Sequence, residues 1–350
     1  MKILIDVSHP AHVHFFKNAI HLFIENEHEV KLVSRDKDIT IQLLDLSGFN
    51  HDVLSIAPKN KNIFNFFCEM MSHCNRLYIK AKKFKPDVML QIAGTFIAPV
   101  GRLVGSPSVV FYDTEFAFLS NSISYPLANC VCTPSCYNKN ILFGRHIKYE
   151  GYHELAYLHP NYFFPDKKYL LENKLDENEK FFIVRFVNWS ALHDYNEKGF
   201  SVKCKINLIQ MLSCFGKVLI SSEGDLPDEL LMYKSNVSYE KIHHVMAYAT
   251  MVIGESATMA SEAAVLGVPS VFISTTPRGY TDEQEYRYKI VKNFKPNQQE
   301  ECLAYVESIV SRKLEDIRSE YNAKRCKILQ EKIDVTEWIY NFIIKEKYKS

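Results

Sequence analysis

Residues 253–269 of the chain read IGESATMASEAAVLGVP and hold a complete passage from one strand, through a helix, toward the next strand. The apolar strand pattern ends at Gly254, and small or hydroxylated residues form the turn that follows. A helix is expected to begin near Thr258 and to end at Gly267, because glycine closes many helices and Pro269 cannot continue one. An apolar run comes next, so this stretch predicts a helix that connects two parallel strands.

The same alternation of short apolar runs with longer segments of helical period continues in both directions along the chain. This pattern is typical of a parallel sheet covered by helices. Each run ends in a polar or turn-forming cluster, where α/β proteins place their ligand contacts. The first helix is expected over about residues 13–26. The expected strands lie at residues 3–5, 29–34, 87–91, 108–112, 130–133, 181–186, 217–221, 251–254 and 270–273.

The strands fall into two series, so we predict an α/β fold of two Rossmann-like, doubly wound domains that face each other across a cleft. The first domain is expected over residues 1–160 and the second over 161–325, with a linker rich in Pro and aromatic residues at 159–166. Residues 326–350 form a helical tail, for which packing against the first domain is one option. A length of 350 residues with 47% hydrophobic content is ample for two cores.

The composition excludes several classes of protein. Lys and Arg number 42 against 41 Asp and Glu, so the net charge is +1 and bulk attraction to nucleic acid is not expected. The nine cysteines have no paired spacing, and the cluster of Cys130, Cys132 and Cys136 runs through an apolar stretch without a fourth zinc ligand. No apolar run of about 18 residues is present. We therefore expect a cytoplasmic protein with reduced thiols, no metal and no nucleic-acid partner.

The turn after Gly254 has the properties of an anion-binding site. Small residues at a helix N-terminus let backbone N–H groups approach a phosphate, and the helix dipole favours the negative charge. Glu262 lies one turn inside the predicted helix, where its carboxylate can accept hydrogen bonds from both hydroxyls of a ribose. The alternative interpretation is that Ser256 and Thr258 only cap the helix and that Glu262 is a solvated surface charge.

The spacing from Ser256 through Glu262 to the stop at 267–269 resembles the donor-nucleotide motif of the GT-B superfamily. It is similar to the Ser-Gly-Gly…Glu…Leu-Gly-x-Pro segment of UDP-GlcNAc 2-epimerase. It is also similar to the Ser-Gly-Ala…Glu…Gly-x-Pro segment of the peptidoglycan lipid-linked GlcNAc transferase. The resemblance implies that Glu262 holds the ribose and that the turn contacts the diphosphate. The donor-binding residues of the turn would be Ser256, Ala257, Thr258 and Met259, with Ala257 and Thr258 standing where one or two Gly are usual.

Residues 6–14, DVSHPAHVH, follow the first strand and lead into the first helix. In the transferase this region is a Gly-rich loop that ends in Gly-His, and His12 falls on that His. Imidazole exchanges protons near neutral pH, so the resemblance implies that His12 is a candidate general base. Two alternatives remain: His9, His12 and His14 are polar loop residues, or they bind a metal as His-x-x-His-x-His. Metal is disfavoured because the run bends from loop into helix and has no evident carboxylate partner.

Residues 111–121, FYDTEFAFLSN, begin at the end of another predicted strand. The segment resembles the transferase's His-Glu-Gln-Asn…Asn loop, which lies on the acceptor side. Asp113 and Glu115 would stand where a general base for an acceptor hydroxyl belongs. The alternative is that Asp113 or Thr114 caps a helix.

A narrower group within the superfamily is similar over about residues 1–295. It consists of bacterial and archaeal proteins long filed as a GT-B-like domain of unknown function. This likeness implies the GT-B fold and names no substrate. The matching segments are residues 6–16, 113–115, 151–160, 185–189 (which include Asn188 and Trp189), His193-Asp194, 221–223 and the helix of Glu262.

Arg185 ends the first strand of the second series and is expected to bind the diphosphate. A guanidinium suits this role because it pairs with two phosphate oxygens at once. Its alternative role is a salt bridge to Asp194 or Glu223. Ser222 and Glu223 end the next strand and are expected to reach the donor.

Two further positions enter the donor site through the resemblance alone. His243 precedes a predicted helix where relatives contact the base. Gln284, with Glu285 beside it, falls near a Gln-Gln pair that holds the donor sugar in the transferase.

Two other segments suggest a function but also fit an ordinary structural role. Asp36-Lys37-Asp38 spells the Asp-x-Asp of another glycosyltransferase fold, but it ends a predicted strand and fits a solvated turn. Residues 59–85 interleave aromatic and Met side chains with Arg and Lys. Such a helix either faces a core or lies on an anionic membrane, which leaves peripheral contact with the inner face of the cytoplasmic membrane open.

Together these features predict a metal-independent glycosyltransferase without a cofactor. Its donor would be a nucleotide-sugar, most simply UDP-linked, and its acceptor a surface polysaccharide, a lipid-linked precursor or another glycan. Inversion at the anomeric carbon is expected by analogy with the transferase. The alternatives are a UDP-GlcNAc 2-epimerase-like enzyme and a non-catalytic nucleotide-sugar binding protein.

Overall fold

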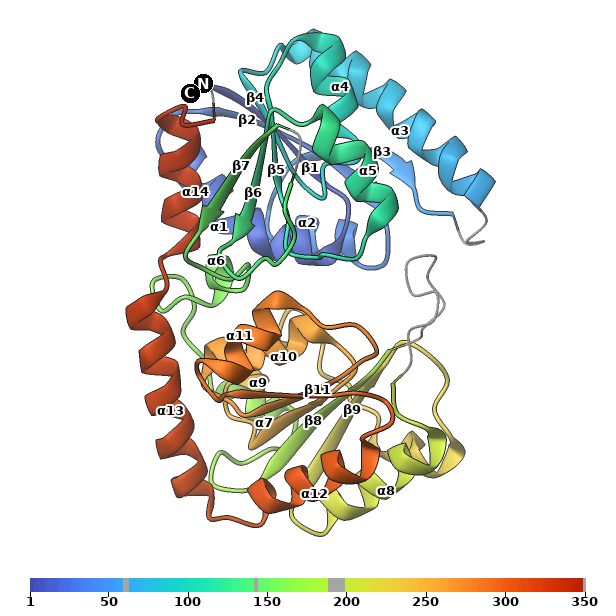
Figure 1. Ribbon diagram of the computed structural model, residues 1–350, viewed down its shortest axis with the longest axis vertical. Coiled ribbons are helices and arrows are strands. Elements are labelled where there is room, and N and C mark those ends of the chain that lie inside the picture. The colour runs from blue at the N-terminus through green and yellow to red at the C-terminus, as the bar shows by residue number, and fades with distance from the viewer. Residues whose placement is uncertain (59–62, 142–143, 188–198, 349–350) are drawn as a thin grey trace. The chain divides into compact units, whose positions relative to one another are not determined.

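The computed structural model describes residues 1–58, 63–141, 144–187 and 199–348. These residues form two compact units, each of which is described by itself (Figure 1). The first unit comprises Met1–Tyr157 together with Ile333–Ser350, and the second unit comprises Leu158–Lys332.

In the described part of the first unit, the strands form a seven-stranded parallel sheet with the order β3-β2-β1-β4-β5-β6-β7. The order reverses beside β1, because β2 lies on one side of it and β4 on the other. Such a reversal opens a crevice at the carboxyl ends of the two strands, where α/β proteins bind ligands. The strands are β1 (Lys2–Val7), β2 (Glu29–Asp36), β3 (His51–Ile56), β4 (Val88–Ile92), β5 (Ser108–Phe111), β6 (Cys130–Pro134) and β7 (Arg145–Tyr149).

Helices cover both faces of this sheet (Figure 1). On one face α1 lies between α2 and α14, and on the other α4 lies between α3 and α5. The last helix, α14, buries Val335, Ile339 and Phe342, so the end of the chain completes the core of the first unit. The helices are α1 (Pro10–Glu25), α2 (Thr40–Leu46), α3 (Ile63–Phe84), α4 (Ile97–Val104), α5 (Phe118–Leu127), α6 (Leu155–Leu158) and α14 (Val335–Ile344).

The second unit has, in the residues described, a five-stranded parallel sheet with the order β12-β11-β10-β8-β9. Here the order reverses beside β8, which has β9 on one side and β10 on the other. The strands are β8 (Phe181–Phe186), β9 (Lys217–Ser222), β10 (Met251–Gly254), β11 (Ser270–Ile273) and β12 (Val291–Phe294). The helices are α7 (Lys168–Glu172), α8 (Val202–Ser213), α9 (Ile242–Met246), α10 (Ala257–Leu266), α11 (Gly279–Tyr286), α12 (Gln299–Val310) and α13 (Leu314–Glu331), with a 3₁₀ helix at Asp228–Tyr233.

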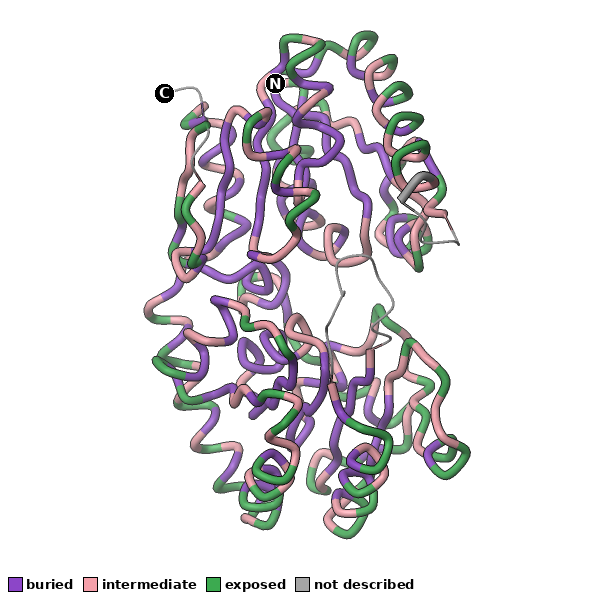
Figure 2. The backbone as a smooth tube through the Cα atoms, turned by 45° about the vertical axis from the view of Figure 1, so that its right-hand side comes forward, coloured by how far each residue is buried: buried purple, intermediate pink, exposed green. Residues whose placement is uncertain are grey.

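The prediction of two doubly wound α/β sheets is confirmed. Within each unit the central strands run as buried segments, and exposed residues gather on helices and loops around them (Figure 2). Three strands were not predicted, namely β3, β7 and β12, and all three lie at sheet edges. Their sequences, HDVLSI, RHIKY and VKNF, carry polar residues because an edge strand has a neighbour on one side only.

The first helix begins earlier than expected, at Pro10 rather than near Val13. His9 has an extended backbone, and its Nδ1 atom accepts the N–H of Ala11 at 3.2 Å, so His9 caps the helix. Proline suits the first helical position because its fixed φ is helical and its missing N–H would have no partner there. His12 and His14 therefore lie on α1, and the interpretation of both as loop residues is wrong.

None of the helices in the described ranges combines the length and the apolar character that crossing a bilayer requires.

Candidate functional site

The carboxyl edge of the second sheet brings Arg185 and Gly254 side by side. Arg185 on β8 pairs with Gly254 on β10, the two strands at which the order reverses. A Cβ atom at residue 254 would lie 2.3 Å from the backbone oxygen of Arg185, so only glycine allows this approach. The glycine that ends the predicted strand thus lets the two strands meet at the crevice.

The helix α10 starts shortly after Gly254, and its N-terminus lies at the same carboxyl edge of the sheet. Ser256 caps the helix, with its Oγ accepting the N–H of Met259 at 3.3 Å. No acidic residue lies in the first turn, and Ser256, Ala257, Thr258 and Met259 are all half-buried. The first turn of a helix has N–H groups without an intrahelical partner. Capping by Ser256 and anion binding by the remaining N–H groups are therefore compatible.

Glu262 lies on the buried side of α10. It is 6% exposed, and its Oε1 atom is 2.8 Å from Nε2 of His243 on α9. The interpretation of Glu262 as a solvated surface charge is therefore wrong. His243 is the second residue of α9 rather than a residue before the helix. The imidazole fixes the direction of the carboxylate, as a ligand-binding acid requires.

Arg185 is held by two neighbours on β9 and on the segment that follows. One Nη atom donates to Ser221 Oγ at 2.6 Å, and the other forms an ion pair with Glu223. The alternative of a salt bridge to Glu223 is thus realised, whereas Asp194 lies outside the described residues. The Nε atom of Arg185 is buried and has no hydrogen-bond partner among the residues described. Glu223 is 45% exposed, so an incoming anion can replace it at the guanidinium.

Two other predicted donor residues lie in different surroundings. Ser222 is half-buried and donates its hydroxyl to the oxygen of Gly224 at 2.9 Å. Gln284 is fully buried, and its Nε2 donates to Ser261 Oγ at 2.8 Å. Glu285 binds Lys292 on β12 through an ion pair of 2.7 Å. Gln284 and Glu285 therefore hold α11 to its neighbours, and their contact with a donor sugar stays a prediction.

Glu255 is a buried carboxylate for which the sequence analysis gave no role. Its Oε2 accepts the N–H of Val187 and its Oε1 the N–H of Phe200, each at 2.8 Å, while the Nζ of Lys205 lies 3.5 Å away. Burial raises the pKa of this carboxyl. A Cβ at Gly199 would lie 2.2 Å from Glu255 Oε1, so a larger residue there would have to displace the Glu255 side chain. The signal was a lone acid between an apolar strand and a turn of small residues.

Glu255 thus joins the two chain segments that flank residues 188–198. The segments that match the narrower group include Asn188, Trp189, His193 and Asp194. These four residues fall in this range, outside the described residues.

In the first unit, His12 lies on α1 next to the carboxyl end of β1. The N–H of Ser8 lies 3.4 Å from its Nδ1 atom. The pKa of His12 is held well below its ordinary value, mainly by burial and then by the positive charges of His9, Lys37 and His153. Asp113 acts in the opposite direction and raises it. The structure therefore brings His12 and Asp113 into one electrostatic neighbourhood.

Asp113 follows β5 and contacts His153, which follows β7. Its Oδ2 lies 3.2 Å from His153 Nδ1, and its Oδ1 accepts the hydroxyl of Thr114 at 3.0 Å. Neither Asp113 nor Thr114 caps a helix, because α5 begins at Phe118 with Ala117 as its cap. His153 belongs to a segment that matches the narrower group, yet the sequence analysis assigned it no role.

Glu115 is turned to different neighbours. It is 3% exposed, and its charge adds to the effect of burial, which is the main cause of the raised pKa values of Tyr125 and Tyr137. The hydroxyls of these two tyrosines contact each other. The amide of Asn121 donates to its backbone oxygen at 3.3 Å. His12, Asp113 and His153 therefore form one group, and Glu115 belongs to the tyrosine cluster beside it.

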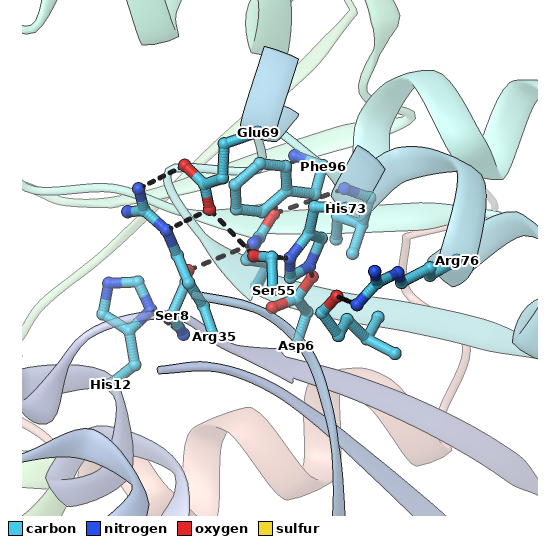
Figure 3. A network of polar contacts seen from close by, with 12 residues as sticks. Asp6, Ser8, His12, Arg35, Ser55, Glu69, His73, Arg76 and Phe96 are labelled. Atoms are coloured by element: carbon cyan, nitrogen blue, oxygen red, sulfur yellow. Dashed lines mark hydrogen bonds and ion pairs between the residues drawn. The ribbon is translucent and has the colours of Figure 1, made fainter. Parts of the chain in front are cut away.

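A buried polar network connects the first three strands of this sheet to α3 (Figure 3). Asp6 Oδ2 lies 2.8 Å from His73 Nε2, and His73 Nδ1 lies 2.8 Å from Ser55 Oγ. Glu69 accepts from Ser55 at 2.8 Å and pairs with both edge nitrogens of Arg35. These hydrogen bonds and the ion pair of Arg35 with Glu69 join β1, β2 and β3 to α3.

Helix α3 combines two faces. His73, Leu77 and Ala81 are buried toward the sheet, whereas Phe67, Met71 and Ile79 are about half-exposed or more. Its last turn carries Lys82 and Lys83. Both expectations for this segment, a core-facing helix and a membrane-facing one, therefore keep a physical basis.

In the described ranges, which include His9, His12 and His14, no group of three or more His, Cys, Asp and Glu side chains is arranged to hold a metal ion. All nine cysteines are free thiols, and Cys130 and Cys132 lie buried on β6 with their sulfurs 3.8 Å apart.

Over residues 1–343 the sequence matches the model of the family described as "Protein of unknown function (DUF354)". The uncharacterized protein MJ0665 of Methanocaldococcus jannaschii is 22% identical over 329 residues, which cover 90% of this chain and 93% of that protein.

Solved structures share the fold over nearly the whole chain. UDP-GlcNAc 2-epimerase from Neisseria meningitidis bound to UDP-GlcNAc is 15% identical with a TM-score of 0.70, covering 100% of both chains. The S. aureus MnaA–UDP co-structure is 9% identical with a TM-score of 0.67, covering 98% of this chain and 95% of that one. The glycotransferase of kitacinnamycin is 12% identical with a TM-score of 0.62, covering 98% of each. The predicted GT-B-like fold is confirmed by these likenesses.

Proposed function

Because the chain belongs to the DUF354 family, whose description names no reaction, we propose a function from its own geometry. The chain is an enzyme that binds a nucleotide-sugar in its second unit and transfers the sugar to an acceptor hydroxyl presented by its first unit. The donor is UDP-linked, and the acceptor is a surface glycan or a lipid-linked precursor. The reaction is metal-independent and inverts the anomeric carbon.

One observation carries this proposal: Glu262 is buried, oriented by His243, and lies behind the N-terminus of α10 at the reversal of strand order. A fixed carboxylate suits the paired hydroxyls of a ribose, because each hydroxyl can donate to it. The N–H groups of the first turn and the guanidinium of Arg185 supply the positive potential that a diphosphate needs. All these groups belong to the second unit.

The likeness to solved structures supports the choice of uracil nucleotides. The structures from Neisseria meningitidis and S. aureus contain UDP-GlcNAc and UDP, respectively. Positive groups at the diphosphate would also stabilise the leaving group as the bond to the sugar breaks, which removes the need for a metal ion.

The second candidate is a UDP-GlcNAc 2-epimerase-like reaction. It is supported by the full-length likeness to the UDP-GlcNAc 2-epimerase from Neisseria meningitidis, at a TM-score of 0.70. In that reaction acids and bases of the chain act on the donor sugar alone, and no acceptor is needed.

The experiment begins with a thermal-shift panel of UDP, ADP, GDP, TDP and UDP-GlcNAc on the full chain. A nucleotide that binds the folded state at a hundred times its Kd adds about 2.7 kcal/mol, which raises Tm by several degrees. UDP and UDP-GlcNAc are expected to raise Tm, and the other nucleotides to have a smaller effect. No shift with any nucleotide contradicts the proposal.

Mass analysis of products then separates the candidates. Release of UDP from UDP-GlcNAc only in the presence of a glycan acceptor supports transfer. A C2 epimer formed from the donor alone supports the second candidate. Binding without any product, across a range of acceptors, supports a non-catalytic binding protein.

A further inference from the structure

Asp113 lies in one neighbourhood with two histidines of the first unit. His153 Nδ1 is 3.2 Å from Asp113 Oδ2, and the charges of both groups act on His12. The three side chains come from the segment after β5, the segment after β7 and the first turns of α1. Two histidines near one carboxylate can take different roles, because the hydrogen bond at one ring nitrogen decides which nitrogen keeps a lone pair.

The hydrogen bond to His12 indicates which ring nitrogen of the neutral imidazole carries the proton. The backbone N–H of Ser8 is directed at Nδ1, which must therefore accept, so the proton of the neutral ring sits on Nε2. The pKa of His12 is lowered mainly by burial and also by neighbouring charge such as that of Lys37, which keeps the ring neutral. A neutral imidazole with Nε2–H donates a hydrogen bond and cannot take a proton at that atom.

His153 has the opposite tautomer. A carboxylate accepts hydrogen bonds, so the ring proton of His153 lies on Nδ1, facing Asp113, and Nε2 keeps its lone pair. The ring is 9% exposed, lies against Phe15 at 4.4 Å between centroids, and runs parallel to the ring of Tyr149 at 6.5 Å. These aromatic neighbours fix the plane of the imidazole.

The Nε2 atom of His153 is buried and, in the part of the chain that the structure describes, has no hydrogen-bond partner. The hydroxyl of Tyr149 is in the same situation. Buried polar atoms without partners are rare in folded proteins, and they occur where a ligand or a catalytic step supplies the partner. Two of them beside one ion pair mark a place for a polar group of a substrate.

We propose that His153, oriented by Asp113, is the general base of the first unit, and that His12 donates a hydrogen bond from Nε2. The inference rests on the proposed glycosyl transfer. The acceptor hydroxyl gives its proton to His153 Nε2 while its oxygen forms a bond to the anomeric carbon. The bond from that carbon to the diphosphate oxygen breaks, and the nucleoside diphosphate leaves with the electron pair. Asp113 stabilises the imidazolium that results, as an acid that orients a base does elsewhere.

The tautomers are tested first, without any ligand. Two-dimensional proton–nitrogen spectra of the full chain labelled at histidine report which ring nitrogen carries the proton. The signals are assigned with His153→Gln and His12→Gln. We expect Nδ1–H for His153 and Nε2–H for His12. An Nε2–H tautomer at His153 overturns the inference, because that atom would then have no lone pair.

Turnover is tested second, as release of UDP from UDP-GlcNAc with a glycan acceptor. His153→Gln is expected to lower it by about 10²- to 10⁴-fold, the range for a lost general base. UDP affinity should be unchanged, because the nucleotide site lies in the other unit. In His153→Ala, added imidazole should restore part of the lost rate, which a merely structural role would not allow. The exposed His21 on the same helix as His12 supplies the control His21→Gln.

Asp113→Asn is expected to lower turnover less than His153→Gln does, and the double variant should be no slower than His153→Gln alone. Turnover of His153→Gln equal to that of His21→Gln overturns the inference while leaving the proposed function intact. A chain with the expected tautomers that binds neither UDP nor UDP-GlcNAc contradicts the proposed function instead.

Discussion

The two sheets carry the same kind of pair at their carboxyl edges, a carboxylate close to an imidazole, but the chain assembles the two pairs differently. Glu262 lies in the continuous strand–helix segment 253–269, and its partner His243 is 19 residues away. Asp113 and His153 follow two different strands, and His12 joins them from the first helix. A site held in one turn can be recognised from spacing, whereas a site assembled from three segments needs the fold.

The largest expected effect concerns the glycines near the two reversals of strand order. Gly254→Ala places a Cβ 2.3 Å from the backbone oxygen of Arg185, whereas Gly94→Ala, which follows β4, meets the side chain of Val110. The backbone of Arg185 cannot change rotamer to relieve this clash, so we expect Gly254→Ala to lower the unfolding free energy by about 3 kcal/mol. Gly94→Ala also has an unfavourable positive φ, but Val110 can move, and we expect about 2 kcal/mol. Denaturant unfolding measures both.

Gly105→Ala is the control for these glycines, because that residue has a positive φ but open space around its Cβ. Its cost should be about 1 kcal/mol, the strain alone. If Gly254→Ala unfolds no more easily than Gly105→Ala, the close approach of Gly254 on β10 to Arg185 on β8 is not a feature of the folded chain.

The next effect separates the two carboxylates by function. Glu262→Gln removes the charge that is expected to accept the ribose hydroxyls, and hydrogen bonds to charged groups are worth about 1.5–3 kcal/mol. We therefore expect UDP affinity to fall about 10- to 100-fold, measured by calorimetry. Asp113→Asn should leave UDP affinity unchanged and act on turnover alone.

Glu307→Gln is the matched control for Glu262, because Glu307 is an exposed glutamate of the same unit. Equal UDP affinity in Glu262→Gln and Glu307→Gln would contradict the placement of the nucleotide at Glu262. A fall in UDP affinity of similar size in Asp113→Asn would contradict the assignment of nucleotide binding to Glu262 and of turnover to Asp113.

The central strands and the α10 segment could be predicted because each is a local pattern. Strands such as residues 181–186 have a neighbouring strand on both sides and are buried, so their residues are apolar except for Arg185 near the carboxyl end. The edge strands β3, β7 and β12 could not be found in this way, since half of their surroundings is solvent or a polar side chain. Local chemistry also misplaced the start of α1, because a His at the cap position is an uncommon signal.

The candidate site was predicted unevenly for the same reason. Glu262 and Ser256 lie where spacing puts them, at a buried helix face and at its cap. The partner of Asp113 could not be foreseen, because the contact with His153 depends on where β5 and β7 end in space. Glu255 was within the quoted motif, but its role as an acceptor for Val187 and Phe200 depends on the path of the chain after β8.

The third effect concerns pH and is expected in the first unit. In the folded chain the pKa of His12 lies well below 6.5, mainly through burial, while the unfolded chain keeps the ordinary value. As pH falls below about 6.5 the unfolded state binds a proton that the folded state does not, so the unfolding free energy decreases. The contribution is fully present above that pH. His12→Gln should make the loss of stability between about pH 7 and pH 5 shallower, by at most one proton or about 1.4 kcal/mol per pH unit.

His21→Gln serves as the control for this slope, because His21 is exposed on the same helix. Denaturant unfolding at several pH values gives the slopes directly. If His12→Gln and His21→Gln have the slope of the unmodified chain, His12 is hydrated in the folded state, and its assignment as a permanently neutral donor fails with it.

The smallest effect concerns the exposed apolar residues of the two units. Phe67 and Met71 on α3 are each 54% exposed, and Lys82 and Lys83 follow in the last turn. If the acceptor is lipid-linked, this face lies on an anionic membrane, with the aromatic ring in the interface and the lysines at the headgroups. The double variant Phe67→Ser, Met71→Ser should then lower binding to phosphatidylglycerol vesicles a few-fold, measured by co-sedimentation.

Phe164→Ser is the control, because Phe164 is 73% exposed in the second unit and has no place in the membrane interpretation. Exposed apolar residues are common on proteins and need no explanation when they occur singly. What sets α3 apart is that apolar and basic side chains share one helix, so high salt should also weaken vesicle binding. Vesicle binding that is insensitive to salt and equal in both variants would show that α3 is an ordinary core-facing helix. It would also favour an acceptor glycan that is not attached to a lipid.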